Sequence, residues 1–246
     1  MSLIRLDKVM KRFGAVEALR GVDLTIESGE VIGLVGDNGA GKSTLFKILA
    51  GVHTPDEGEM RFEDSPVRFS NPIDARKVGI EIVYQDLALC NNLNAALNIF
   101  LGRELVRGLG PIRFLDEGAM RRKAQTLIKQ LEVNVNVNEP VRSMSGGQRQ
   151  AVAIARALLG NAKVILLDEP TAAISITAVE QVLKLINQLK AQGHTVVIVS
   201  HRMSDIFEVC DRVVVMRHGQ NVASKAIRDT TREEVTGLIT GAIAYA

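Results

Sequence analysis

The chain has 246 residues, of which 46% are hydrophobic and 24% are charged, so its composition is that of a folded globular protein and excludes disordered and fibrous classes. Thirty Lys and Arg residues nearly balance 28 Asp and Glu residues. They are scattered along the chain without a long basic block, a distribution that does not favour nucleic acid as a partner.

The cysteines and the lengths of the apolar runs indicate the cellular compartment of the chain. Cys90 and Cys210 are isolated from each other and from any histidine cluster, as expected for two free thiols in a reducing compartment. A membrane-spanning helix needs about 20 mostly apolar residues, whereas the apolar runs 196–199 and 213–216 are strand-sized. The N-terminal residues mix charged with apolar side chains and lack the apolar core of a secretory signal. We therefore expect a cytoplasmic chain that does not itself cross a bilayer.

The N-terminal part predicts an antiparallel layer followed by a central strand. Apolar and polar residues alternate over 3–9 and 22–26, on either side of a Gly-Ala turn, which predicts two paired strands. Residues 30–35 form a nearly continuous apolar run that leads into glycines, as expected for a strand buried on both faces. A helix over 42–50 follows, with Gly51 just past its end.

The middle of the chain changes to a helical pattern. Apolar residues recur at helical spacing over 93–100 and 120–131, so we predict a mostly helical subdomain there. Residues 134–138 alternate like a strand, yet an Asn-rich stretch that ends before Pro140 favours a loop.

Strands and helices alternate through the rest of the chain. The pattern predicts helices over 148–160 and 179–189, and strands over 164–167, 195–199 and 212–216. Such alternation indicates an α/β fold with a mostly parallel sheet, helices on both of its faces and an antiparallel β edge layer.

These elements predict a single domain over residues 1–246. Its catalytic core takes about residues 1–85 and 149–246, and a helical subdomain of about residues 86–148 is inserted into that core. The sequence contains no internal repeat and no low-complexity stretch.

A phosphate-binding loop follows the predicted central strand. Residues 36–43 fit the pattern Gly-x-x-x-x-Gly-Lys-Ser/Thr between a buried strand and a helix, which is the context this motif requires. Backbone N–H groups can cradle phosphate oxygens, Lys42 supplies a positive charge for the β and γ phosphates, and the Ser43 hydroxyl can coordinate Mg²⁺. The predicted nucleotide-binding residues are Gly36, Asp37, Asn38, Gly39, Ala40, Gly41, Lys42, Ser43 and Thr44.

The loop predicts a nucleotide-binding P-loop NTPase of the RecA-like kind. By itself it leaves a kinase, a GTPase, a motor and a transporter subunit open, because one fold hosts all of these activities.

An acidic pair ends the predicted strand over 164–167. Asp168 stands at the carboxyl end of that strand, where ligands bind in open α/β sheets, and is expected to hold the Mg²⁺ shell. The adjacent Glu169 is then placed to orient or deprotonate the attacking water. A carboxylate at this position, with Lys42 in the phosphate loop, predicts a hydrolysing site.

A second candidate anion site lies far from the phosphate loop in sequence. Ser145, Gly146, Gly147 and Gln148 open a predicted helix, so small residues and exposed N–H groups again meet a helix dipole. Because one loop already holds the phosphates, the second site is free to contact the γ phosphate of an ATP bound to another copy. The sequence therefore predicts a head-to-tail dimer with two shared ATP sites.

With these motifs, the chain resembles the nucleotide-binding subunits of ABC transporters over nearly its whole length, with Met144 where Leu is commonest before the signature. The resemblance implies that Phe13 stacks on adenine, that Gln85 reaches Mg²⁺ and water, and that His201 is a switch residue near the γ phosphate. Ser175 departs from the family's usual Asp and removes a charge expected at the dimer interface. The resemblance implies no role for His53, His194 and His218.

Three short stretches narrow the resemblance. Residues 84–89, 98–104 and 240–242 are similar to ATPases of bacterial monosaccharide importers of the ribose, xylose and fructose type. This implies an ATPase that energises sugar uptake as a homodimer, with separate transmembrane permease subunits and, indirectly, a periplasmic or extracellular sugar-binding protein. The chain is then expected at the cytoplasmic face of the inner membrane, held there by the permease.

Two alternatives stay open. A soluble ABC ATPase acting in nucleic-acid repair or translation would lack a membrane partner, but the long coiled coils, basic arms or second cassette that would support it are missing from this sequence. A small-molecule kinase could use the same phosphate loop, but it leaves residues 145–148 unexplained.

Overall fold

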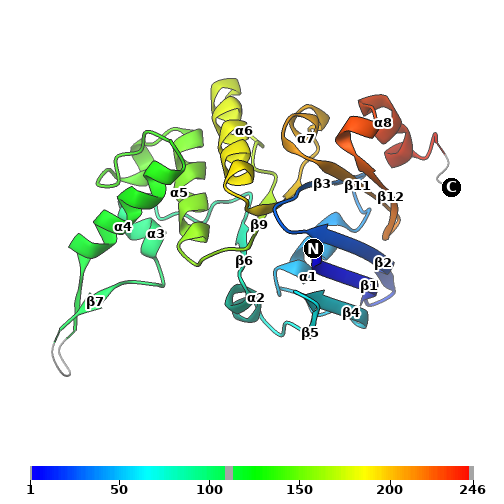
Figure 1. Ribbon diagram of the computed structural model, residues 1–246, viewed down its shortest axis with the longest axis horizontal. Coiled ribbons are helices and arrows are strands. Elements are labelled where there is room, and N and C mark those ends of the chain that lie inside the picture. The colour runs from blue at the N-terminus through cyan, green and yellow to red at the C-terminus, as the bar shows by residue number, and fades with distance from the viewer. Residues whose placement is uncertain (1, 109–112, 244–246) are drawn as a thin grey trace.

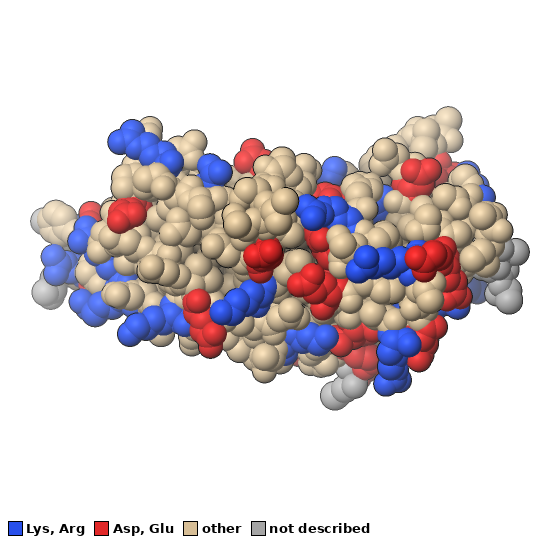
Figure 2. Space-filling view, turned by 90° about the horizontal axis from the view of Figure 1, so that it is seen from above, with Lys and Arg blue, Asp and Glu red and all other residues tan. Residues whose placement is uncertain are grey.

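The computed structural model describes residues 2–108 and 113–243. The molecule is elongated, with a group of helices at one end and the β-sheets at the other (Figure 1). Lys and Arg side chains interleave with Asp and Glu over the face that carries helices α6 to α8 (Figure 2). No helix among residues 2–108 and 113–243 is both long enough and apolar enough to cross a membrane.

An antiparallel sheet forms the outer layer of the sheet-containing end. Its strands are β1 (Ser2–Phe13), β2 (Val16–Glu27), β4 (Glu57–Phe62) and β5 (Ser65–Val67), in the order β2-β1-β4-β5. Alternate residues of β2 from Val22 to Ile26 are buried, as the sequence pattern predicted. In β1 the alternation is interrupted, because Leu3 and Ile4 are both buried and the register shifts before Val9. The predicted edge layer is therefore confirmed, and it is a separate sheet.

The second sheet is mostly parallel, with the order β12-β11-β3-β10-β9-β6. Strands β3 (Val31–Gly36), β6 (Ile80–Val83), β9 (Val164–Asp168), β10 (Thr195–Val199) and β11 (Arg212–Arg217) run in parallel. Strand β12 (Gln220–Ala226) is antiparallel to β11. Every residue of β3 and β10 is buried. Because the parallel strands share one direction, the residues that follow β3, β6, β9 and β10 gather at one edge of the sheet.

Helices cover both faces of this sheet. Helix α1 (Lys42–Leu49) lies between the two sheets, where its apolar face packs with Ile4, Leu6 and Ile32. Helices α6 (Ile176–Ala191) and α7 (Met203–Val209) belong to the hydrophobic cluster on the opposite face. Helices α2 (Pro72–Val78), 3-10 helix η2 (Ile227–Asp229) and α8 (Arg232–Thr240) complete this end.

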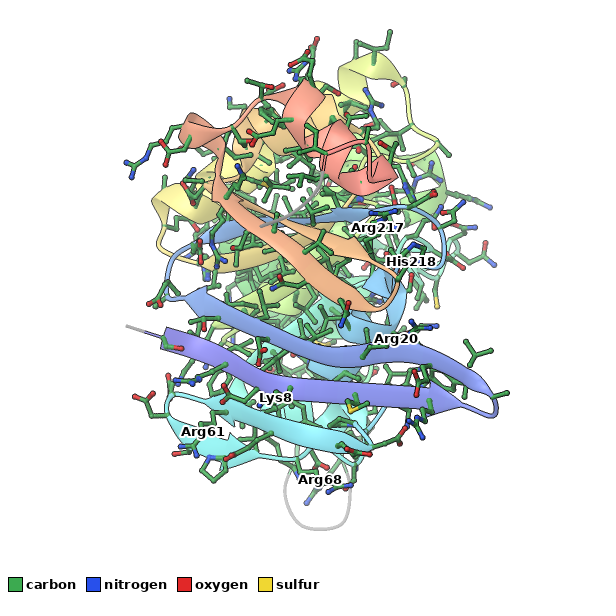
Figure 3. The ribbon with its side chains drawn as sticks, turned by 90° about the vertical axis from the view of Figure 1, so that its right-hand side faces the viewer. Lys8, Arg20, Arg61, Arg68, Arg217 and His218 are labelled. Atoms are coloured by element: carbon green, nitrogen blue, oxygen red, sulfur yellow. The ribbon has the colours of Figure 1, made fainter. Side chains whose placement is uncertain are left out.

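The two sheets are joined at the turn between β11 and β12. The backbone N–H of Arg20 on β2 donates to the carbonyl of Gly219, 2.8 Å away. Figure 3 views this end of the molecule and shows the basic side chains Arg20, Arg217 and His218 near the turn, with Lys8, Arg61 and Arg68 spread below them. These side chains come from several elements and do not converge on one point.

The helical end contains α3 (Ala95–Phe100), the short strands β7 (Val106–Arg107) and β8 (Phe114–Leu115), α4 (Glu117–Gln130), 3-10 helix η1 (Val141–Ser143) and α5 (Gly146–Leu158). Residues 134–138 form neither helix nor strand, which confirms the predicted loop. Helix α5 packs on α3 and α4 at one side and on α6 and β6 at the other. It therefore joins the helical end to the sheet, and the predicted subdomain limits stay a prediction.

Candidate active site

The backbone conformation of the loop between β3 and α1 requires glycine at three positions. Gly36, Gly39 and Gly41 have φ values of 151°, 79° and 100°, which side-chain-bearing residues rarely adopt. A Cβ atom on Gly36 would also overlap the carbonyl oxygen of Met216, and one on Gly41 would lie 2.7 Å from the carbonyl oxygen of Ala18. The loop therefore holds its N–H groups in a tight turn at the start of α1.

Lys42 lies across this loop. Its Nζ donates hydrogen bonds to the carbonyl oxygens of Gly36, at 2.7 Å, and of Asp37, at 2.9 Å. Burial lowers the pKa of the ammonium, while the nearby carboxylates of Glu169 and Asp37 oppose that shift. A phosphate group in the loop would place further negative charge beside this buried cation.

A cavity of about 460 Å³ opens beside the loop and collects predicted residues from four separate parts of the chain. Its walls are Val16, Glu17, Ala18, Asn38, Gly39, Ala40, Gly41, Lys42, Ser43, Thr44, Gln85, Asp168, Glu169, Val199 and His201. Gln85 follows β6, the acidic pair ends β9 and His201 follows β10, so the sheet edge brings these side chains to the phosphate loop.

The two carboxylates stand in partly buried positions. Burial raises the pKa of Asp168 and of Glu169, and the neighbouring His201 acts in the opposite direction on both. The Nε2 atom of His201 lies 3.1 Å from Oε1 of Glu169. Oε1 is nevertheless buried without a hydrogen-bond partner among the described residues, so this contact leaves the acceptor unsatisfied.

The backbone at Glu169 is strained. Its φ is +49°, in the left-handed region that non-glycine residues avoid, and its N–H donates to the carbonyl of Val199 at 2.9 Å. This conformation turns the chain sharply at the end of β9 and directs successive carboxylates into the same cavity.

Phe13 and residues 145–148 do not line this cavity. Phe13 ends β1, faces Val16 across the turn in register, and exposes 44% of its surface. Because Val16 is part of the cavity wall, the aromatic ring stands at the rim.

Residues 145–148 open helix α5 on another part of the surface. Ser145 Oγ accepts from the Gln148 N–H at 3.2 Å, and Gln148 Oε1 accepts from the Ser145 N–H at 2.9 Å, so the two form a capping box. A Cβ atom on Gly147 would overlap the side chain of Gln181, which explains the second glycine. A neighbouring cavity of about 340 Å³ runs from Gly146 to Gln85 and Glu169.

Two residues without a predicted role hold the segment after Gln85. Arg156 on α5 donates to the carbonyl oxygens of Leu87, at 2.7 Å, and of Ala88, at 2.9 Å. The buried Asn98 on α3 accepts from the N–H of Cys90 at 2.7 Å and donates back to its carbonyl at 3.0 Å. Nothing in the sequence distinguishes Arg156 from a surface arginine, because only the folded chain shows which carbonyls it meets.

Ser175 has a local role that fits its departure from the usual Asp. It caps the N-terminus of α6, where its Oγ accepts from the N–H of Ala178 at 3.3 Å. Ser and Asp are both favoured at this position, so the cap is retained while the charge is removed.

The residues present fit a nucleotide with Mg²⁺. Ser43 and Asp168 offer the hydroxyl and carboxylate oxygens that Mg²⁺ prefers, and the strained loop offers N–H groups to phosphates. Residues 2–108 and 113–243 contain no cluster of three or more His, Cys, Asp or Glu side chains that could hold a metal ion. Mg²⁺ is usually held by one or two protein oxygens and takes its remaining ligands from phosphate and water, which fits the pair Ser43 and Asp168.

A profile of the ABC transporter family matches residues 19–172, a range that includes the phosphate loop, the signature and the acidic pair. The chain belongs to the ABC transporter family. Two relatives align over nearly the whole of this ABC protein. The xylose/arabinose import ATP-binding protein XylG of Sulfolobus acidocaldarius is 45% identical over 97% of the chain and 94% of its own length. The fructose import ATP-binding protein FrcA of Rhizobium meliloti is 42% identical over 95% of the chain and 92% of its own length.

A solved structure supports the same assignment. The dimeric post-hydrolysis state of the ATP-binding cassette MJ0796, bound to ADP and Pi, superimposes on this ABC protein with a TM-score of 0.74 and 28% identity, over 93% of the chain and all of that structure. The predicted family, P-loop NTPase fold class and ABC-type ATPase are therefore confirmed. The roles of the individual site residues stay predictions.

Proposed function

We propose that this chain hydrolyses ATP to energise the uptake of a monosaccharide through a separate permease. The observation that carries the proposal is the cavity that joins the phosphate loop to Gln85, Asp168, Glu169 and His201. Two relatives that align over most of their own length are sugar import ATP-binding proteins, which supports the choice of cargo.

Each wall of the cavity has a task in this proposal. The N–H groups of residues 38–44 and the ammonium of Lys42 bind the phosphates, and adenine stacks on Phe13 beside Val16. Glu169 takes a proton from the attacking water, and Gln85 and His201 orient that water and the γ phosphate. When bound by Ser43, Asp168 and Gln85, Mg²⁺ would neutralise charge on the phosphates.

A second copy completes the site. Ser145 to Gln148 lie outside the cavity of their own chain, and their N–H groups at the start of α5 suit the γ phosphate of an ATP held by the partner. The solved cassette MJ0796 is dimeric with ADP and Pi bound, which supports a homodimer of this kind.

Coupling to transport follows from the same dimer. ATP can drive the permease between two states only if it binds the closed dimer more tightly than the open one. The permease would dock near Gln85 and the helical end and hold the chain at the cytoplasmic face of the inner membrane. An external sugar-binding protein would deliver the sugar.

The substitution Glu169→Gln tests the proposal. It should leave ATP binding intact and stop hydrolysis, so that ATP drives the full chain into a stable dimer detectable by light scattering. Glu208→Gln, on the exposed side of α7, is the matched control and should hydrolyse ATP like the wild type.

Transport is tested in cells that lack the chain. Wild-type protein should restore uptake of labelled xylose, ribose or fructose, whereas Glu169→Gln should not. Wild-type hydrolysis by Glu169→Gln would show that another group is the base, and restored ATPase without restored uptake of any of the three sugars would reject the proposed cargo.

A further inference from the structure

An aromatic pair stands at the rim of the nucleotide cavity. The ring of His53 packs against the ring of Phe13 with their centroids 5.1 Å apart and an interplanar angle of 65°, which is an edge-to-face arrangement. Aromatic rings prefer this geometry because the positive edge of one ring meets the negative face of the other. Phe13 still exposes 44% of its surface, so it has surface free for a further contact.

The position of His53 is set by the helix that carries the phosphate loop. His53 follows the C-terminal end of α1, where its N–H donates to the carbonyl of Lys47 at 3.2 Å. The N–H of Val52 donates to the same carbonyl at 2.8 Å. The phosphate loop stands at the N-terminal end of that helix, so one rigid element connects the two regions.

The residues after His53 are attached to the end of β1. Asp56 accepts hydrogen bonds from Lys11 Nζ and from the Arg12 N–H, each at 2.7 Å, and its own N–H donates to the carbonyl of Met10 at 3.0 Å. The Nζ atom of Lys11 also lies 5.5 Å from the centroid of the Phe13 ring. Phe13 is therefore held through its side chain by two neighbours and through its strand by Asp56.

We propose that His53 is a positioning residue that orients Phe13 as the stacking surface for adenine. The proposal rests on the proposed function, in which Phe13 contacts the base. An unsupported phenylalanine at the end of a hairpin would sample several rotamers, and adenine could stack only on one of them. The edge-to-face contact with His53 selects one orientation of the Phe13 ring before the nucleotide arrives and keeps the ring in register with the phosphate loop.

The test compares two ligands that differ in the base. The full chain is titrated calorimetrically with ADP and, separately, with inorganic pyrophosphate, both with Mg²⁺. His53→Ala should weaken ADP binding by about threefold to tenfold, the range expected for an aromatic pair, and leave pyrophosphate binding unchanged. His53→Phe should restore ADP affinity because it keeps an aromatic edge. Val52→Ala, in the same connection, is the control and should bind both ligands like the wild type.

The Phe13→Ala chain separates this inference from the proposed function. If Phe13→Ala binds ADP like the wild type, Phe13 does not contact adenine, so the adenine contact in the proposed function and the positioning role of His53 are both wrong. If Phe13→Ala weakens ADP binding and His53→Ala does not, only the positioning role of His53 is wrong.

The double variant decides how His53 acts. In the Phe13→Ala background, adding His53→Ala should cause no further loss, because His53 works through the ring that has been removed. A loss that persists there would mean a direct contact between His53 and the nucleotide, and a loss of pyrophosphate affinity would mean a disturbed phosphate loop. Either result overturns the positioning role.

Discussion

The Nε2 atom of His201 lies 3.1 Å from Oε1 of Glu169, so an imidazole that follows β10 meets a carboxylate that follows β9. Burial raises the pKa of Glu169 above its ordinary value, and the charge of His201 is the largest influence in the opposite direction. The proposed base, Glu169, needs its carboxylate form to accept a proton. Hydrolysis should therefore fall away on the acid side at a pH above the ordinary range of a glutamate.

Replacing His201 with Gln should move this acid limb to higher pH, because the group that lowers the pKa of Glu169 is removed. The maximal rate should also fall, by about 100-fold. The measurement is kcat for ATP hydrolysis between pH 5 and 9. If the acid limb of the pH profile lies at the same pH in His201→Gln and in the wild type, the titration of Glu169 does not cause that limb.

Asp168→Asn should raise the thermal stability of the nucleotide-free protein. Burial makes the pKa of Asp168 higher in the folded chain than in the unfolded chain, so folding favours the protonated form. Protonated Asp168 therefore stabilises the folded chain at a pH below the pKa of the unfolded chain, and this contribution is lost as the pH rises through the pKa of the folded chain. At pH 7 the neutral Asn should therefore increase Tm by about 1 to 3 °C, and the difference should vanish below about pH 4.

Calorimetry in EDTA measures this difference, and Asp229→Asn, which removes an exposed carboxylate, is the control. ATP hydrolysis should be lost in Asp168→Asn and kept in Asp229→Asn. If the difference in Tm between Asp168→Asn and the wild type grows as the pH falls, the pKa of Asp168 is not raised by folding and the prediction is wrong.

Mixed dimers should test whether residues 145–148 act on the partner's nucleotide. Ser145→Arg and Lys42→Ala should each be inactive alone. When equal amounts are mixed, half of the dimers contain one of each, and each of these holds one intact composite site. ATPase activity should then recover to about a quarter of the wild-type level. Inactive mixed dimers, verified by mass spectrometry, would place the signature at its own chain's ATP.

Gly160→Ala should destabilise the protein through an ion pair whose acidic partner is buried. Arg103 Nη2 lies 2.5 Å from Oε1 of Glu81, which is buried on β6, and a Cβ atom on Gly160 would overlap both side chains. Separating such a pair should cost about 2 to 4 kcal/mol of unfolding free energy.

Urea denaturation measures this loss, and Gly118→Ala on α4 is the matched control. A Cβ atom there meets nothing closer than 3.5 Å, so that substitution should stay within about 1 kcal/mol of the wild type. If Gly160→Ala and Gly118→Ala are equally stable, the side chains of Glu81 and Arg103 move to accommodate the Cβ atom and stay paired.

Strong periodicity and motif context explain what could be predicted from the sequence. Strands β3 and β9 were expected because continuous apolar runs lead into glycines or carboxylates. Helix α1 was expected because it follows those glycines and ends before Gly51. Strand β6 was not predicted, since it has four residues and one of them is the charged Glu81. The buried carboxylate of Glu81 is paired with Arg103, which lies 22 residues away in the sequence.

The sequence by itself predicted the site of this protein: a phosphate loop whose glycines permit the turn, an acidic pair at a strand end, and a second candidate anion site that is proposed to serve a partner copy. These features are local, because each depends on neighbouring residues. Only the tertiary structure decided that Arg156 holds the carbonyls after Gln85 and that His53 supports Phe13. Such contacts join residues about 40 to 70 positions apart, and no periodicity or spacing encodes which side chains the fold will bring together.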